Sequence, residues 1–332
     1  MKQFLTACFL LSAGATMAQS EQYHVSKTFP AGSGDGKWDY IALNPVNGQL
    51  YATHGTVVNI LDKKTGDSTG LIPNTTGVHG VAFAEKFRKG YTTNGKLNTS
   101  TVFNIQTNQV LGEIKTGSKP DAILFDPFSQ KIIICNGSSA NLTVIDPASD
   151  KVVATVALGG SPETAVTDGK GHIYVNLEDK SEVVKVDANT FTAGPHWSLG
   201  KGEAPTGLAI DVSTHRLFSG CDNKWLVVLN ADNGHIVTTL SIGDGCDGVA
   251  FDATEKTIFA ANGEGTLSVI QELSADKYLS TATIPTRKGA RTLVADPQTH
   301  RVYLPVADYL PAAGNAKATV APGTFKVLEV SK

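Results

Sequence analysis

Short apolar segments recur along the chain, and each one follows a polar residue. They read DYIALN, HGVAFA, DAILFD, ETAVTD, TGLAID, DGVAFD and RTLVAD, and they begin at intervals of 40 to 44 residues. A period of this length with short strands is typical of the blades of a β-propeller. The pattern therefore predicts seven repeated units.

Two further apolar segments follow in every unit. The second segments are LYATH, GYTTN, IIICN, IYVNL, LFSGC, IFAAN and VYLPV, and the third include VVNILD, NLTVID and WLVVLN. A fourth, weaker segment follows, as in KVVATVALG, and the turns are rich in Asn, Gly, Pro, Asp and Thr. Aliphatic and β-branched segments between tight turns predict strands, and no long helical periodicity interrupts them. We expect an all-β fold with four-stranded blades.

The two ends of the chain complement each other. FKVLEV, starting at Phe325, reads as a third strand with no fourth strand after it, whereas YHVSKTFPAG, starting at Tyr23, reads as a fourth strand without its first three. We therefore expect the N-terminal strand to complete the last blade, which also covers a sheet edge. Residues 19–332 would then form one seven-bladed propeller domain, which we expect to be a monomer.

The repeat has a recognisable motif. VIDPASDKVVATVALGGSPE followed by IYVN resembles the YVTN-type repeat of exported bacterial propellers, the YncE-like family. The resemblance covers essentially the whole of residues 19–332, although three repeats end differently, in YVNL, FSGC and YLPV. It implies the propeller fold and an exported protein that binds a ligand or a partner. It implies no particular reaction, and related propellers include sugar lactonases and a streptogramin lyase.

The first eighteen residues have the features of a secretory signal peptide. Lys2 precedes an apolar run from Phe4 to Ala15, and Thr16-Met17-Ala18 offers small residues for cleavage. We expect a periplasmic or secreted protein, and no other segment is apolar for long enough to span a membrane. Removing Lys2 leaves 27 Lys and Arg against 31 Asp and Glu, a net charge of −4. This balance argues against nucleic-acid binding, which needs a basic surface.

The polar residues that open the first strands should surround one mouth of the central channel. They are Asp39, His79, Asp121, Glu163, Thr206, Asp247 and Arg291. Crowded carboxylates raise one another's pKa and can become ligands or general acids and bases. We expect a small molecule or a protein partner to bind there, with Trp38 stacking on the ligand. The alternative is a solvated ring whose polar groups only satisfy loop backbone.

A divalent cation is one candidate ligand. Asp39, His54, His79 and Asp121 could hold Zn, Mn or Ca, although both histidines could equally be hydrogen-bonded loop residues. With a metal, the chain could be a hydrolase or lyase of the lactonase type. The candidate catalytic residues would then be Glu163, as the base, and Arg291.

Three cysteines remain after the signal peptide. Cys221 and Cys246 occupy matching positions in neighbouring blades, so a disulfide between them is one hypothesis, and two free thiols are the other. Cys135 lies in the apolar segment IIICN and is expected in the core.

Overall fold

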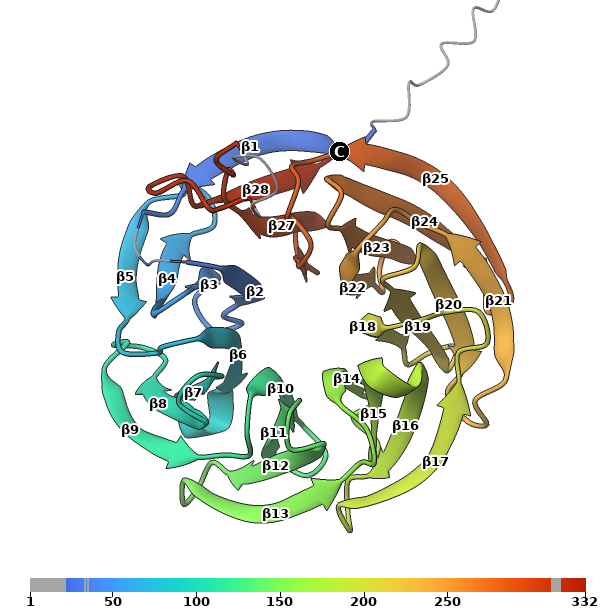
Figure 1. Ribbon diagram of the computed structural model, residues 1–332, viewed down its shortest axis with the longest axis horizontal. Coiled ribbons are helices and arrows are strands. Elements are labelled where there is room, and N and C mark those ends of the chain that lie inside the picture. The colour runs from blue at the N-terminus through green and yellow to red at the C-terminus, as the bar shows by residue number, and fades with distance from the viewer. Residues whose placement is uncertain (1–21, 33, 35, 312–317) are drawn as a thin grey trace, which may run out of the picture.

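The computed structural model describes residues 22–332 except 33, 35 and 312–317. It contains seven four-stranded antiparallel sheets arranged as a ring around a central channel (Figure 1). The predicted seven-bladed β-propeller is therefore confirmed. The expected signal peptide, residues 1–18, lies outside the described residues. No helix in the described part of the chain is both long and apolar enough to cross a membrane.

The first four blades follow one another along the chain. Blade one consists of β2 (Trp38–Leu43), β3 (Gln49–His54), β4 (Val57–Asp62) and β5 (Ser68–Ile72). Blade two consists of β6 (Val78–Ala84), β7 (Lys89–Asn94), β8 (Thr99–Asn104) and β9 (Val110–Lys115). Blade three consists of β10 (Pro120–Asp126), β11 (Lys131–Asn136), β12 (Asn141–Asp146) and β13 (Lys151–Ala157). Blade four consists of β14 (Pro162–Thr167), β15 (His172–Leu177), β16 (Glu182–Asp187) and β17 (Thr192–Ser198).

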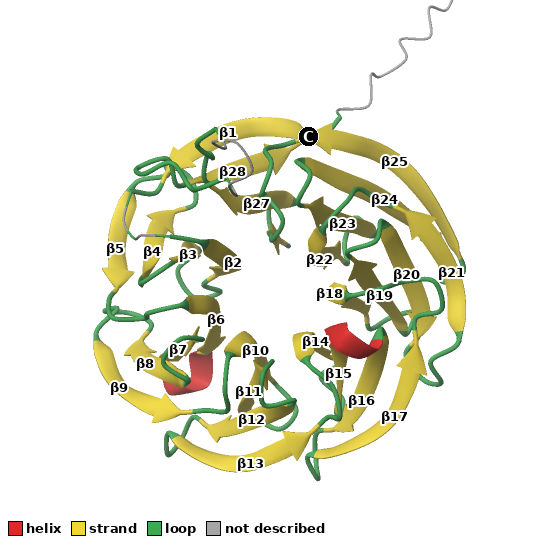
Figure 2. Ribbon diagram, in the orientation of Figure 1, coloured by secondary structure: helices red, strands yellow, loops and turns green. Residues whose placement is uncertain are grey.

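The last three blades complete the ring. Blade five consists of β18 (Pro205–Asp211), β19 (Arg216–Cys221), β20 (Trp225–Asn230) and β21 (Ile236–Ser241). Blade six consists of β22 (Cys246–Asp252), β23 (Thr257–Asn262), β24 (Thr266–Ser274) and β25 (Lys277–Pro285). Blade seven consists of β26 (Val294–Asp296), β27 (Arg301–Val306), β28 (Lys326–Ser331) and β1 (His24–Pro30). Two short 3-10 turns, η1 (Glu85–Phe87) and η2 (Glu178–Lys180), are the helices in Figure 2.

The chain closes the ring as its ends predicted. The N-terminal strand β1 is the outermost strand of blade seven and pairs antiparallel with β28, with Thr28 opposite Leu328. The ring of Tyr23 then lies edge-on to Phe259 in blade six, with 5.3 Å between the centroids. Residues from both ends of the sequence therefore share one apolar core.

Packing of the middle strands holds neighbouring blades together. The second and third strands of each blade are almost entirely buried, whereas the outermost strands β9 and β13 are largely exposed. Between blades one and two, Tyr51 stacks on Phe103 at 5.8 Å. Gly90 leaves room for this packing, because a Cβ there would lie 2.2 Å from the Phe103 ring. Burial of this kind contributes about 25 cal/mol per Å² of apolar surface.

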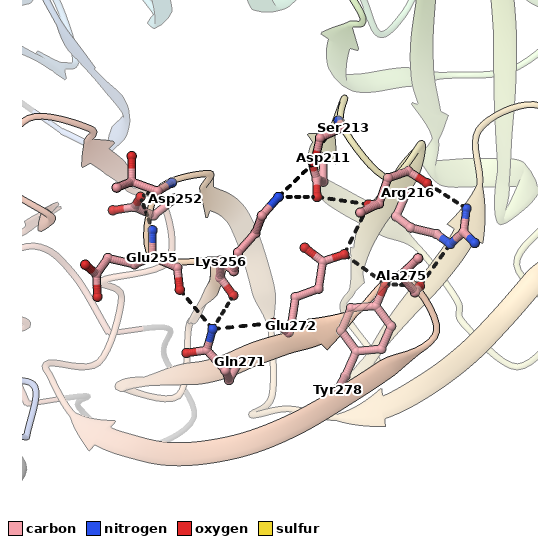
Figure 3. Close-up of polar contacts among 12 residues, drawn as sticks. Asp211, Ser213, Arg216, Asp252, Glu255, Lys256, Gln271, Glu272, Ala275 and Tyr278 are labelled. Carbon is pink, nitrogen blue, oxygen red and sulfur yellow. Dashed lines mark hydrogen bonds and ion pairs between the residues drawn. The ribbon is translucent and has the colours of Figure 1, made fainter.

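Charged contacts link the blades on the face away from the mouth. The aspartate that ends a first strand contacts the next blade: Asp211 lies 2.9 Å from the Lys256 ammonium, and Asp252 lies 2.7 Å from the His300 ring. Asp296 lies 2.6 Å from Lys63 and so joins blade seven to blade one. Figure 3 shows the contact between blades five and six, where the side chain of Arg216 donates to the carbonyl of Ala275 at 3.0 Å.

Candidate functional site

The first strands bring their opening residues to one mouth of the channel. β2, β6, β10, β14, β18 and β22 surround the central opening (Figure 1). A cavity of about 670 Å³ lies there, which we call the mouth cavity. Its lining includes all seven of the predicted opening residues: Asp39, His79, Asp121, Glu163, Thr206, Asp247 and Arg291.

One half of the mouth cavity is organised around Arg291. Its Nε lies 2.9 Å from Oδ2 of Asp247, and its Nη2 lies 3.7 Å from Oδ1 of Asp39. The guanidinium therefore sits between carboxylates that come from blades six and one. Thr206, the opening residue of blade five, takes no part in these charge contacts. Its hydroxyl donates a hydrogen bond to the backbone carbonyl of Cys246 at 2.5 Å.

The other half continues the alternation of charge. His79 Nδ1 lies 2.5 Å from Oδ2 of Asp39 and 3.4 Å from Oδ1 of Asp121. Lys119 Nζ then lies 3.5 Å from Oδ2 of Asp121 and 3.8 Å from Oε1 of Glu163. We call the resulting chain of alternating charges, drawn from six of the seven blades, the charged arc: Asp247, Arg291, Asp39, His79, Asp121, Lys119 and Glu163.

Burial changes the protonation of the carboxyl groups at the two ends of the charged arc. Burial raises the pKa of Glu163 to about 10, and the charge of Asp121 raises it too, against the opposing charge of Lys119. Burial likewise raises the pKa of Asp247 to about 7, although Arg291 opposes the shift. At neutral pH Glu163 is therefore protonated and can donate a hydrogen bond. It suits a general acid rather than the general base that the sequence suggested.

The pKa of the histidine at the middle of the charged arc is also raised, but by its acidic neighbours and not by burial. Burial lowers the pKa of His79, but its hydrogen bond with Asp39 and the charge of Asp121 outweigh burial and raise the pKa above its usual value. Burial also raises the pKa of Asp121, with the charge of Asp39 adding to the shift. The imidazole thus lies between two carboxylates within a small volume.

Three of the four predicted metal ligands come together. Asp39, His79 and Asp121 each offer one ligand atom, and these atoms lie within 4.8 Å of one another. Two carboxylates and one imidazole suit Zn or Mn better than Ca, which prefers oxygen alone. A cation bound there would replace the hydrogen bond between His79 and Asp39.

His54, the fourth predicted ligand, lies apart from this group. Its ring stacks on Phe325 with 4.2 Å between the centroids, and its Nε2 lies 3.3 Å from the carbonyl oxygen of Gly36. The asparagines that end second strands donate within their blades, although Oδ1 of Asn136 and of Asn262 is buried without a partner. Asn94, for example, donates to the hydroxyls of Thr99 and Thr101 at 3.1 and 2.9 Å. The rim formed by the second strands is therefore largely structural.

Trp38 lies at the wall of the mouth cavity but is 4% exposed. Its indole nitrogen donates to the carbonyl of Gly289 at 3.1 Å, and its ring lies 5.7 Å from Tyr309 and 6.4 Å from Phe325. The ring that was expected to stack on a ligand is thus mostly engaged by protein, with its edge towards the cavity.

Two residues of the site did not emerge from the sequence analysis. Tyr40 reaches across the channel from blade one, and its hydroxyl lies 3.2 Å from the hydroxyl of Thr164 in blade four. The corresponding positions of the other blades hold small residues, so this tyrosine stands out in the aligned repeats: Gly80, Ala122, Thr164, Gly207, Gly248 and Thr292. Lys119 lies in the loop before β10, and its φ of 54° belongs to the left-handed region. No pattern of the strands marks this lysine.

Among the described residues Cys135, Cys221 and Cys246 are free, so the hypothetical disulfide between Cys221 and Cys246 is not formed in the structure. Cys221 packs in an apolar core with Leu199 and Val227. The neighbouring position on β19, Gly220, faces Cys246 instead, because a Cβ there would lie 2.6 Å from the Cys246 sulfur. Adjacent residues of a strand point to opposite faces, and this separates the two thiols. Cys135 is buried in the core as expected.

No protein-family model matches the chain, and a search of curated proteins also gives no match. The propeller fold is consistent with the resemblance to YncE-like proteins. Membership of that particular family stays a prediction that rests on the repeat motif.

Proposed function

We propose that this chain is an exported propeller that binds a small polar ligand in the mouth cavity. The observation that carries the proposal is the charged arc, which gathers four carboxylates and three basic groups around one cavity. Removing so many charges from water opposes folding unless they are well paired. Such groups with shifted pKa values around a concave site are typical of binding and catalytic sites.

The arc also suggests the kind of ligand. It offers positive groups at Arg291, His79 and Lys119, a proton donor at Glu163 and acceptors at Asp39 and Asp121. A molecule with several hydrogen-bonding groups and at least one charge would match this set. A protein partner that inserts a polar side chain into the mouth would use the same groups.

A thermal-shift screen of purified protein tests the proposal. The probes are dicarboxylates, amino acids, polyamines and sugar phosphates, applied to wild type and to the double variant Asp121→Asn/Glu163→Gln. We expect at least one class to raise the melting temperature of the wild type by several degrees and to have no effect on the variant. Equal shifts in both proteins, or no shift with any class, would contradict the proposed site.

Export is the second part of the proposal, and residues 1–18 and the resemblance to exported propellers support it. Cell fractionation with N-terminal sequencing tests it. We expect the protein outside the cytoplasm with Gln19 as its first residue. An intact N-terminus in the cytoplasmic fraction would contradict export.

A metal-assisted hydrolase or lyase is a second candidate function. It is favoured by the group of Asp39, His79 and Asp121, whose ligand atoms are already close together. A bound divalent cation would polarise a carbonyl of the substrate. Glu163 could then deliver a proton to the leaving group, and Arg291 could orient an anionic part of the substrate.

Metal content and thermal stability separate the two functions. The protein is measured after treatment with EDTA and after addition of Zn, Mn or Ca, together with the variant His79→Ala. An enzyme of this type should contain one metal ion per chain and should be stabilised by it only when His79 is present. Absence of stoichiometric metal from both proteins would leave the ligand-binding function alone.

A further inference from the structure

A second cavity of about 500 Å³ lies beside the mouth cavity. The two cavities share Gly36, Lys37, Trp38 and Arg291 in their walls. The second cavity is otherwise lined mainly by apolar and aromatic residues, among them Tyr309, Val320 and Phe325. We call it the apolar cavity, and a single ligand of moderate size could occupy both spaces.

The aromatic wall of the apolar cavity is built by packing between distant segments. Trp38 contacts both Tyr309 and Phe325, and Phe325 in turn stacks on His54. Tyr309 is held in place because it forms an isolated β-bridge with Val320. The Tyr309 side chain is nevertheless 41% exposed, so part of its ring is available to a ligand. Exposed aromatic surface in a concave site is typical of ligand pockets.

The charges of the apolar cavity have one sign. Among the described residues that line it, Lys37 and Arg291 are the lysine and arginine, and no aspartate or glutamate occurs. Both cations lie where the apolar cavity meets the mouth cavity. Asp247 and Asp39 already pair with Arg291, so the charge that favours an anion at this junction comes mainly from Lys37.

We propose that the apolar cavity binds the hydrophobic part of an aromatic or aliphatic anion, whose charged group lies between Lys37 and Arg291. This inference rests on the proposed function and names its ligand class: an amphipathic organic anion whose polar end enters the mouth cavity.

Two fluorescent probes that differ by one charged group test the proposal. Anilinonaphthalene sulfonate carries an aromatic body and an anionic sulfonate, and N-phenylnaphthylamine has the same aromatic body without the sulfonate. We expect the sulfonate to bind one site per chain and about tenfold more tightly than the neutral probe, as one added ionic contact predicts. Lys37→Gln should remove most of this advantage and leave the affinity of the neutral probe unchanged.

Variants of the aromatic wall test the location. Tyr309→Ala should weaken both probes by about tenfold, because it removes an aromatic contact surface. Val320→Trp should block the space and abolish binding of both. Leu310→Ala is the matched control, since Leu310 is 46% exposed on the same segment and does not line the apolar cavity. It should change neither affinity.

Each outcome decides one part of the proposal. Equal affinity for the two probes, or no effect of Lys37→Gln, overturns the preference for an anion. Unchanged binding in both Tyr309→Ala and Val320→Trp overturns the apolar cavity as the binding site. Neither result affects the screen with Asp121→Asn/Glu163→Gln, which tests the charged arc separately. Conversely, failure of that screen with intact dye binding would reject the mouth site alone.

Discussion

Two buried glutamates lie on opposite faces of the propeller and differ in what surrounds them. Glu163 at the mouth is 8% exposed and lies next to Asp121, and Glu272 on the far face is 5% exposed and lies next to Asp211. In both cases burial and a neighbouring carboxylate raise the pKa, to about 10 for Glu163 and about 7 for Glu272. Both regions therefore contain a buried glutamate whose pKa is raised by burial and by a neighbouring carboxylate.

The surroundings of Glu272 are protein groups rather than a cavity, although its Oε2 is buried without a hydrogen-bond partner. Its Oε1 accepts hydrogen bonds from Thr214 at 3.1 Å and from Tyr278 at 3.5 Å (Figure 3). Burial alone would raise the pKa of Asp211, but hydrogen bonds from Ser213 and Lys256 lower it well below its usual range. Protein groups thus occupy this pair, which serves to join blade five to blade six.

Glu163 is about as buried as Glu272, but its carboxyl group faces a cavity. Its ion-pair partner, Lys119, lies 3.8 Å away, and its carboxyl group lines the mouth cavity. Neither Asp211 nor Glu272 lines that cavity. The comparison teaches that burial and a shifted pKa do not by themselves mark a functional site. A cavity in front of the group distinguishes the mouth from the far face.

The largest effect should come from breaking the far-face network. Asp211→Ala removes the acceptor for Ser213, Thr214 and Lys256 together. Because Asp211 is buried and accepts all of these bonds, we expect the free energy of unfolding to fall by about 3 kcal/mol. Urea denaturation measures this loss. Asp62→Ala is the control, since Asp62 also accepts bonds from turn residues but is more exposed, and it should cost about 1 kcal/mol. Equal losses would show that the network adds nothing.

Removing the carboxyl group at the mouth should stabilise the protein instead of destabilising it. The folded state keeps a proton on Glu163 that the unfolded chain releases above its ordinary pKa of 4.5, so this group costs stability increasingly from pH 4.5 to about pH 10. Glu163→Gln removes the cost, and we expect it to stabilise the protein by about 1–3 kcal/mol at pH 7. Denaturation at several pH values measures the difference, which should vanish below pH 4.5. A destabilised variant at pH 7 would contradict the protonated state.

The far-face glutamate should lower the stability over a narrower range of pH than Glu163 does. The pKa of Glu272 is raised only to about 7, so its cost grows between pH 4.5 and about pH 7 and then stays constant. Removing this cost in Glu272→Gln should raise the free energy of unfolding by about 1–2 kcal/mol at pH 7. We expect a smaller gain than for Glu163→Gln, because the glutamine at position 272 cannot keep every hydrogen bond of the glutamate. The two difference curves should separate between pH 7 and pH 10. Parallel curves in that range would mean that the two sites do not differ.

The smallest effects should come from the two lysines. Lys119 is 47% exposed at the mouth, and Lys256 is 38% exposed on the far face, where it lies 2.9 Å from Asp211. Since half-exposed ion pairs contribute little, Lys119→Met should cost about 0.5 kcal/mol and Lys256→Met about 1 kcal/mol. Thermal denaturation at low and high salt measures both. If Lys119→Met lowered the free energy of unfolding by more than Lys256→Met does, the charged arc would serve mainly to stabilise the fold.

The architecture of the fold could be predicted because its signals are local and repeated. Strand spacing and turn residues fix each blade, and the complementary ends fix the closure. The strand limits of blade seven were less certain. The sequence suggested a strand from Arg291, but β26 begins at Val294. The Thr292 hydroxyl instead donates to the backbone carbonyl of Asp39 at 2.7 Å, which ties this segment to blade one.

The site could be predicted only as far as the repeat determines positions. The residues that open the first strands lie at the same mouth of the channel because the strands are equivalent. Asp39, His79 and Asp121 are three of them. The orientation of a ring at a strand end is not determined by the repeat, and His54 accordingly packs on Phe325 instead of joining His79. Lys119 could not be found in this way, because a left-handed backbone conformation in a loop decides where it lies.

The pairing of β1 with β28 has a consequence for how the protein is made. Strand β1 forms its sheet contacts with residues that are synthesised about three hundred positions later, as in the pairing of Thr28 with Leu328. Until β28 has been made, blade seven is without its outer strand and the segment from His24 to Pro30 has no sheet to join. Contacts between such distant positions form slowly, because closing a long loop costs entropy before the contact forms. The ring therefore closes only when β28 is present, and a chain that stops short of β28 leaves blade seven incomplete and β1 unpaired.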